Sequence, residues 1–174
     1  MEKIKNLVLN KKMVISLISF LFLTSLVTIA PLFHFQPITG LIVNAIFFIT
    51  VSLLGIKYAL LIGLFPSPIA LLTGLLPFIL APIIPFIMLS NIILIITFFC
   101  LKNKNYWLGI IAASVLKFIF LFTTSSVVIN LLLKKEIATK VAEMMSWPQL
   151  LTALGGGVIA YIFLNSLKKV KNNF

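Results

Sequence analysis

The chain has 174 residues, of which 61% are hydrophobic and only 10% charged, and its mean hydropathy is +1.23. A soluble domain is nearer half apolar and a quarter charged, and one of this size could not hide so much apolar surface, so the composition excludes a soluble globular protein. The formal net charge of +11 comes from lysines that gather mostly at the ends of apolar segments. This distribution favours orientation in a membrane over nucleic-acid binding.

Six apolar segments are long enough to cross a membrane as helices. About 20 residues span the hydrocarbon core, where every backbone group must be hydrogen-bonded internally. The segments cover residues 13–33, 38–55, 57–80, 82–101, 106–130 and 147–167. No alternating pattern supports a β-barrel. The sequence therefore predicts an all-α integral membrane protein, with a single domain of six transmembrane helices over residues 1–174.

The first segment follows a basic stretch, residues 1–12, and has some features of a signal peptide. Its apolar run from Met13 to Phe33 is longer than a cleaved signal segment, and Pro31 directly after the small residue Ala30 disfavours cleavage. We therefore expect this segment to stay in the protein as a spanning helix, with residues 1–12 in the cytoplasm.

The lysines predict the direction of the chain. If the N-terminus is cytoplasmic, ten lysines fall in inner segments and three in outer segments. The inner set is Lys3, Lys5, Lys11, Lys12, Lys57, Lys102, Lys104, Lys168, Lys169 and Lys171, and the outer set is Lys134, Lys135 and Lys140. Because cytoplasmic loops carry an excess of lysine, both termini are expected in the cytoplasm.

Prolines interrupt the middle of the chain at two places. Pro66 and Pro68 fall within the third segment and predict a kink there, because proline removes a backbone donor and fixes φ. The next connection, residues 75–86, reads LLPFILAPIIPF and has three prolines and no charge. We expect it to fold back onto the protein as a lid or re-entrant turn.

The connection before the last segment is polar. Residues 134–146 carry apolar side chains at helical spacing and the favourable pair Glu136–Lys140, which predicts a short helix on the outer membrane surface. The last segment then opens with SWPQ, in which Ser146 and Gln149 have the spacing of a capping box.

Lys117 lies near the middle of the fifth segment, and no acidic residue occurs within 18 positions of it. A lysine at this depth costs about 2.5–3.5 kcal/mol, and its stem is too short to reach either membrane surface. Small and polar residues share its helical face, while Ile119 and Phe122 lie on the opposite side. Lys117 is therefore expected to face the interior. Either it forms structural hydrogen bonds with neighbouring carbonyls or, as we favour, it binds an anion from outside.

Two asparagines lie in the outer halves of their segments, Asn44 in the second and Asn91 in the fourth. Buried amides either join helices or bind a ligand. Because Thr124 lies at a similar depth on the face of Lys117, we predict one substrate-binding pocket shared by these four side chains.

Trp147 and Gln149 lie near the expected mouth of that pocket. Trp147 is an interfacial anchor or stacks on the ligand, and Gln149 is a helix cap and a second-choice ligand donor. His34 and Cys100 are the only residues of their kind, so we expect no metal site and no cofactor. There is no Ser-His-Asp set, HExxH sequence, carboxylate pair or Walker motif, so we expect no catalytic residues and no enzyme activity.

Small residues four positions apart predict close helix packing. The pairs are Ala59 with Gly63, Gly109 with Ala113, Ala153 with Gly157, and Gly156 with Ala160. Most are expected to be internal contacts, but the first pair could instead receive a helix of a partner protein.

Taken together, the chain resembles the S component, the substrate-binding membrane subunit, of energy-coupling factor (ECF) transporters. The resemblance is in its length, six predicted helices, cytoplasmic termini and proline-broken outer connection. It is strongest in the stretches PITGLIVNAIFF, GLLPFILAPIIPFIMLSN and SWPQLLTALGGG.

The resemblance implies a multi-pass protein of the bacterial cytoplasmic membrane that captures a small vitamin-like, partly anionic micronutrient from outside. It also implies as partners a transmembrane T component and two ATP-binding cassette ATPases, which would carry out any ATP hydrolysis. Many S components dock the T component through an AxxxA sequence on the first helix. That sequence is missing from residues 13–33, so Ala59 and Gly63 become the candidate docking positions.

Two other classes of function also fit a small polytopic protein. One is a stand-alone oligomeric channel or ion-coupled carrier, and the other is a small membrane-embedded enzyme or assembly factor. The absence of a convincing internal repeat weighs against a carrier built from inverted repeats.

Overall fold

The computed structural model describes residues 2–132, 142 and 145–172, and within these ranges it is helical and has no β-strand. The helices are α1 (Glu2–Ile29), α2 (Gln36–Leu53), α3 (Ile56–Gly63), α4 (Pro66–Leu72), α5 (Ile84–Leu101), α6 (Tyr106–Leu132) and α8 (Trp147–Asn172), with 3₁₀ turns η1 (Ala30–Phe33) and η2 (Phe78–Ile83). The predicted all-α class is confirmed for this part of the chain. The predicted surface helix over residues 134–146 lies mostly outside the described residues.

Five helical segments are long and apolar enough to cross a membrane. They are Lys11–Phe33, Gln36–Leu53, Phe78–Leu101, Tyr106–Val127 and Trp147–Lys169. Together they identify a multi-pass membrane protein.

The third predicted span is different, because it consists of two short helices and not of one kinked helix. Helix α3 ends at Gly63, and the amides of Leu64 and Phe65 donate to carbonyl oxygens three residues back, Leu61 O at 3.3 Å and Ile62 O at 3.2 Å. Helix α4 then starts at Pro66, whose missing N–H is tolerated in a first turn. The combined stretch Ile56–Leu72 is shorter than a spanning helix.

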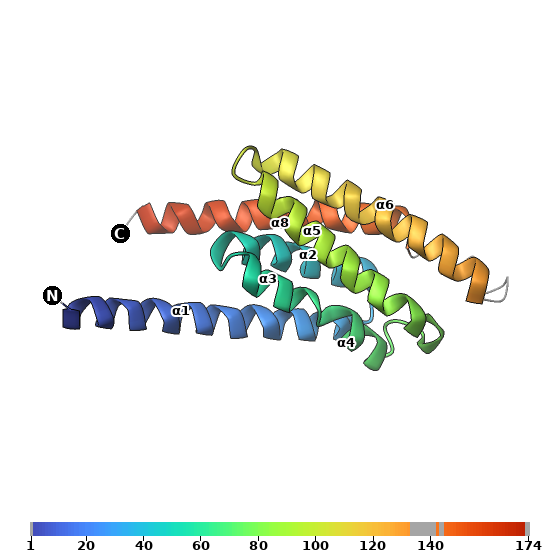
Figure 1. Cartoon of the computed structure of the whole chain (residues 1–174), viewed down its shortest axis with the longest axis horizontal. Helices are drawn as coiled ribbons and strands as arrows, with labels where there is room; N and C mark the ends of the chain where they lie inside the picture. Colours follow the sequence, from blue (N-terminus) through green and yellow to red (C-terminus); the bar gives the residue numbers. More distant parts are fainter. Residues whose placement is uncertain (1, 133–141, 143–144, 173–174) are drawn as a thin grey trace.

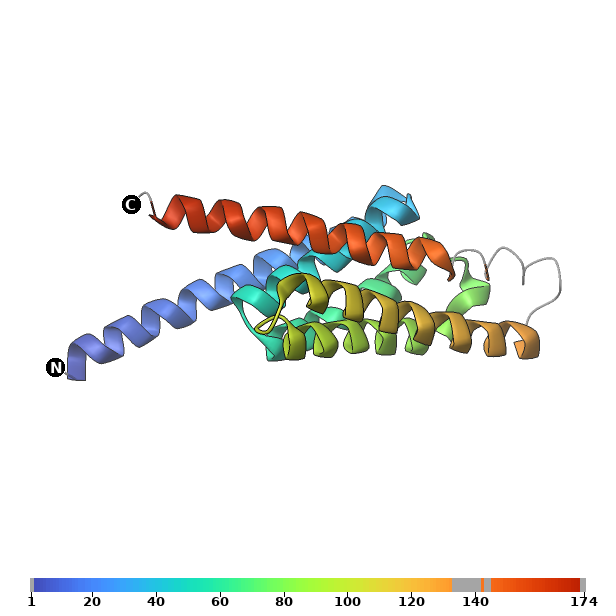
Figure 2. The same ribbon diagram turned by 90° about the horizontal axis from the view of Figure 1, so that it is seen from above.

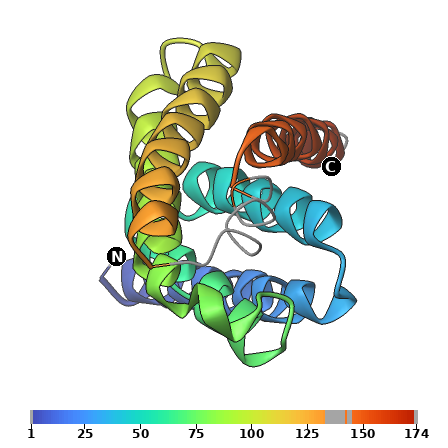
Figure 3. The ribbon, with the colours of Figure 1, turned by 90° about the vertical axis from the view of Figure 1, so that its right-hand side faces the viewer.

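The helices run up and down, so that the N-terminus, the α2–α3 turn, the α5–α6 turn and the C-terminus lie toward one end of the bundle (Figures 1 and 2). Helix α2 packs along α8, and α5 packs along α6. The end view in Figure 3 shows α8 beside α2 and the α5–α6 pair on the other side of the bundle. The two ends of the chain therefore lie toward the same end of the bundle.

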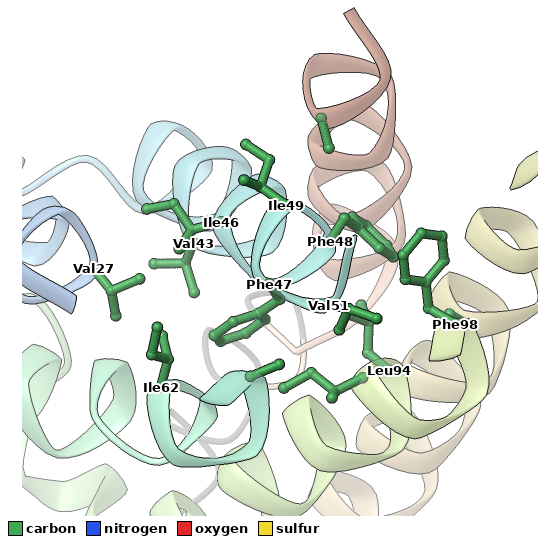
Figure 4. Packing of buried hydrophobic residues seen from close by; sticks show 14 of the residues in the cluster. Val27, Val43, Ile46, Phe47, Phe48, Ile49, Val51, Ile62, Leu94 and Phe98 are labelled. Atoms are coloured by element: carbon green, nitrogen blue, oxygen red, sulfur yellow. The ribbon is translucent and has the colours of Figure 1, made fainter. Parts of the chain in front are cut away.

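A hydrophobic core fills the space between α2, α3 and α5. Phe47 and Phe48 of α2 are fully buried, and Phe48 packs edge-on against Phe98 of α5 with ring centroids 4.7 Å apart (Figure 4). Ile62 of α3 and Val27 of α1 are also completely enclosed. These contacts hold α2 and α5 in place, the helices that carry the buried Asn44 and Asn91.

The proline-rich connection after α4 packs against the protein, as expected. Leu76, Leu80 and Ile83 are buried and form a second apolar cluster with Leu121 of α6, whereas Phe78 on the same turn is exposed. This segment without charges is thus anchored over one end of the bundle by three buried side chains, those of Leu76, Leu80 and Ile83.

The small residues allow close approach of helix backbones. A Cβ on Gly156 of α8 would lie 2.8 Å from Ala45 N and from Asn44 Cβ of α2, which shows how tightly α2 and α8 meet. Ala59 and Gly63 are buried, and Gly63 faces Ile95 and Asn91 of α5. The interpretation of this pair as a docking surface for a partner helix is therefore wrong, because both residues are buried inside the bundle and α5 faces Gly63.

We expect Gly156→Ala to destabilise the protein by about 1–3 kcal/mol, because the added methyl group would meet backbone atoms that cannot move independently. Gly155→Ala is the matched control, since its Cβ would meet only the end of the flexible Leu41 side chain. The measurement is thermal unfolding of the detergent-purified variants followed by far-UV circular dichroism. Equal losses of stability in both variants would show that the backbone contact between α2 and α8 at Gly156 tolerates an added methyl group as well as the contact at Gly155 does.

Candidate functional site

Lys117 of α6 is buried, with 3% of its surface exposed. Its Nζ donates hydrogen bonds to Asn44 Oδ1 of α2 at 2.8 Å and to Asn91 Oδ1 of α5 at 2.9 Å. The ammonium therefore links three helices through two neutral amide oxygens. These bonds partly replace the hydration that the charge loses inside the bundle.

The orientation of α6 explains why Lys117 points inward. The side chains that share its face are buried, including Ala113, Ser114 and Leu121, whereas Ile119 and Phe122 on the other face are about half exposed. The predicted division of α6 into an inward polar face and an outward apolar face is thus confirmed. An arrangement in which the amine reaches a membrane surface is ruled out.

Asn91 connects this cluster to the break between α3 and α4. Its Nδ2 donates to the carbonyl oxygen of Gly63 at 3.3 Å. Gly63 is the last residue of α3, and carbonyl groups at the end of a helix lack intrahelical amide partners. One asparagine therefore accepts from Lys117 and caps the interrupted helix.

A cavity of about 500 Å³ adjoins the Lys117 cluster. This volume is within the range of small-molecule binding sites. The wall comprises Gln36, Pro37, Thr39, Gly40, Val43 and Asn44 of α2, Pro66, Ser67 and Ala70 of α4, Leu75 and Leu76 of the following connection, Ile87 and Asn91 of α5, Lys117 of α6, Met145, and Pro148, Gln149 and Thr152 of α8.

The wall is mostly apolar and carries one charge among its described residues, that of Lys117. Two hydroxyl groups of the wall already donate hydrogen bonds to backbone carbonyls. Thr39 Oγ1 donates to Ala30 O at 3.0 Å, and Thr152 Oγ1 donates to Gln149 O at 3.2 Å. The one charge of the described wall therefore lies at Lys117, beside Asn44 and Asn91, while Gln36, Ser67 and Gln149 add uncharged polar side chains elsewhere.

Four of the six predicted binding residues line this cavity: Lys117, Asn91, Asn44 and Gln149. The structure does not bring the other two to the wall. Thr124 lies two turns beyond Lys117, and its hydroxyl donates to Phe120 O of the same helix at 2.6 Å. Trp147 is 60% exposed, in keeping with its alternative interpretation as an interfacial anchor.

Sequence reasoning missed several wall residues. On α2, the missed residues Gln36, Thr39 and Gly40 share one helical face with the predicted Asn44. On α8, the missed Thr152 follows the predicted Gln149 by three residues. These helical spacings could have extended the predicted pocket from Asn44 and Gln149. Ser67 and Ala70 gave no such signal, because their position depends on the break before α4.

The described residues contain no group of three histidine, cysteine, aspartate or glutamate side chains close enough to hold a metal ion. What the site offers is a positive charge, amide groups and an apolar wall. Such a set can bind a small molecule through charge and shape.

Comparison of the chain with protein-family models, curated proteins and solved structures gave no match. The functional argument therefore depends on the geometry of this site.

Asn91→Ala should destabilise the protein by about 1–3 kcal/mol, because it removes an acceptor from Lys117 and a donor from Gly63 O. The loss should be about 1 kcal/mol smaller in a Lys117→Met background, where no buried ammonium needs that acceptor. Both values come from chemical unfolding of the purified variants in detergent.

Ser90→Ala is the matched control for this double-mutant cycle. Ser90 is buried next to Asn91, but its hydroxyl donates to Ile87 O of its own helix. Its effect should simply add to that of Lys117→Met. Strict additivity for Asn91→Ala as well would contradict the Lys117–Asn91 hydrogen bond.

Proposed function

We propose that this protein is the substrate-capture subunit of an ECF-type ABC importer, and that it binds a small vitamin-like, partly anionic micronutrient in the cavity at Lys117. The observation that carries the proposal is a buried ammonium group that lines a ligand-sized cavity and has no carboxylate partner among the described wall residues. It is supported by the resemblance in helix number and in the quoted sequence stretches.

The energetic argument starts from the cost of a lysine within a membrane protein, about 2.5–3.5 kcal/mol on insertion scales. Two neutral amide oxygens satisfy part of its hydrogen-bonding capacity but do not compensate its charge. A purely structural link between three helices could use neutral side chains at lower cost. An incoming anion gives the charge a function, because it supplies the missing counter-charge only when the substrate is bound.

The proposed topology has six membrane segments, with the broken α3–α4 pair as the third and both termini in the cytoplasm. Gln36 and Gln149 stand at the beginnings of α2 and α8, at the end of the bundle opposite the termini (Figure 2). With the termini inside, the cavity lies in the outer half of a bacterial cytoplasmic membrane. This is the position from which a capture subunit would take a nutrient.

The proposed partners are a transmembrane T component and two ATP-binding cassette ATPases. Since Ala59 and Gly63 are buried inside the bundle, the T component would have to contact another surface. The chain itself would bind the nutrient without chemical conversion, and the ATPases would supply the energy for import.

The proposed topology can be tested with reporter fusions at the C-terminus. Alkaline phosphatase, which is active only outside, should be inactive at Phe174, and green fluorescent protein, which matures inside, should fluoresce. The opposite pattern would place the cavity on the cytoplasmic side and would exclude capture from outside.

The function itself is tested in liposomes. The chain should mediate nutrient uptake only when the T component, both ATPases and internal ATP are present, and Lys117→Met should abolish uptake while the complex still assembles. Uptake by the chain alone, without ATP, would instead identify a channel or ion-coupled carrier. Chemical conversion of the nutrient would identify a membrane-embedded enzyme.

A further inference from the structure

We propose that the cavity selects a monocarboxylate with an uncharged, largely apolar body, and that the acid group binds deep in the cavity between Lys117 and Asn44. This inference rests on the proposed capture function and narrows its substrate class. It follows from the hydrogen-bond donors that the Lys117 cluster leaves unused and from the nature of the remaining wall.

The ammonium group determines the orientation of both asparagines. An ammonium has three N–H donors and no acceptor, so only the oxygen of a carboxamide can face it. Asn44 and Asn91 therefore both turn Oδ1 toward Lys117 Nζ, at 2.8 and 2.9 Å. Two of the three ammonium donors are used in this way, and one is left.

The side-chain amide nitrogens of the two asparagines differ in whether they already donate a hydrogen bond. Nδ2 of Asn91 donates to Gly63 O, so this residue is occupied at both ends. Nδ2 of Asn44 has no acceptor among the described residues, and Asn44 lines the cavity together with Lys117. The cluster thus offers the cavity two kinds of donor, an ammonium N–H and a carboxamide N–H₂.

A carboxylate matches this pair of donors. Its two oxygens can accept from Lys117 Nζ and Asn44 Nδ2, and its single negative charge compensates the single positive charge of the described wall. A neutral carbonyl could accept the same hydrogen bonds but would leave the ammonium uncompensated. A cation would meet the lysine without any carboxylate in the described wall to attract it.

The rest of the wall limits the body of the ligand. Most of it is apolar, and its aliphatic side chains are those of Val43, Ala70, Leu75, Leu76 and Ile87. Gln36, Ser67 and Gln149 add polar side chains that carry no charge. The hydroxyls of Thr39 and Thr152 already donate to backbone carbonyls. A second acid group on the ligand would find no second cation in the described wall, so a polyanion such as a nucleotide would be poorly bound.

The selectivity can be tested with the purified full-length chain and a water-soluble small-molecule extract of yeast as the probe mixture. Detergent-solubilised protein is incubated with the extract and washed, and the bound compounds are identified by mass spectrometry in both ion modes. The compound enriched by the wild-type protein should carry one carboxylate and an apolar body. Lys117→Met should reduce its enrichment at least about tenfold. Lys104→Met, which removes an exposed lysine outside the cavity, should leave enrichment unchanged.

Asn44→Asp is the decisive second variant, because it places a carboxylate beside Lys117 with almost no change in shape. This internal counter-charge should abolish enrichment of the compound while the variant unfolds at or above the temperature of the wild-type protein. If Asn44→Asp folds and still enriches the compound, Lys117 has only a structural role and the inference is wrong, whatever the behaviour of Lys117→Met.

The remaining outcomes separate this inference from the function on which it rests. Enrichment of a polyanion would overturn the monocarboxylate assignment and leave capture of an anionic nutrient standing. Enrichment of a cation or a neutral compound would overturn the monocarboxylate assignment and also the anionic character of the proposed nutrient. Failure of the wild-type protein to enrich any compound from the extract would overturn both.

Discussion

The hydrogen bonding of one buried ammonium group organises this protein. Lys117 Nζ is held by Asn44 Oδ1 and Asn91 Oδ1, which are contributed by different helices. Because an ammonium cannot be left without partners in an apolar interior, α2, α5 and α6 must approach one another at this point. Asn91 also donates to Gly63 O, so the network reaches a fourth helix, α3, at its C-terminal end.

The cavity depends on two backbone features on either side of this network. The break between α3 and α4 allows Pro66, Ser67 and Ala70 to form one part of the wall. The glycines of α8 bring its backbone against α2, which places Thr152 next to Gly40, where a Cβ would lie only 3.0 Å from Thr152 Cβ. The ligand-sized cavity inside this apolar bundle therefore depends on three features. They are the charge of Lys117, the break between α3 and α4, and the close approach of α2 and α8.

The roles of the asparagines show how sequence reasoning can identify residues and still miss their arrangement. Asn44 and Asn91 were predicted as ligand donors or helix links because a polar amide in a membrane segment needs a partner. In the structure they are acceptors for Lys117, which lies 73 and 26 residues away in the sequence. Thr124 was grouped with them from its helical face alone, but it lies two turns further along α6 and bonds within its own helix.

The sequence by itself determined the membrane class, the positions of most helices, the inward face of α6 and the interruption near Pro66, because these follow from composition, from helical periodicity and from the missing N–H of proline. Only the tertiary structure decided that the third segment becomes two separate helices, that Gly63 faces α5 and that Lys117 meets two asparagines beside a cavity. These features are contacts between segments far apart in the chain. Local patterns restrict which face of each helix is buried, but the helix that covers that face depends on the packing of the whole bundle.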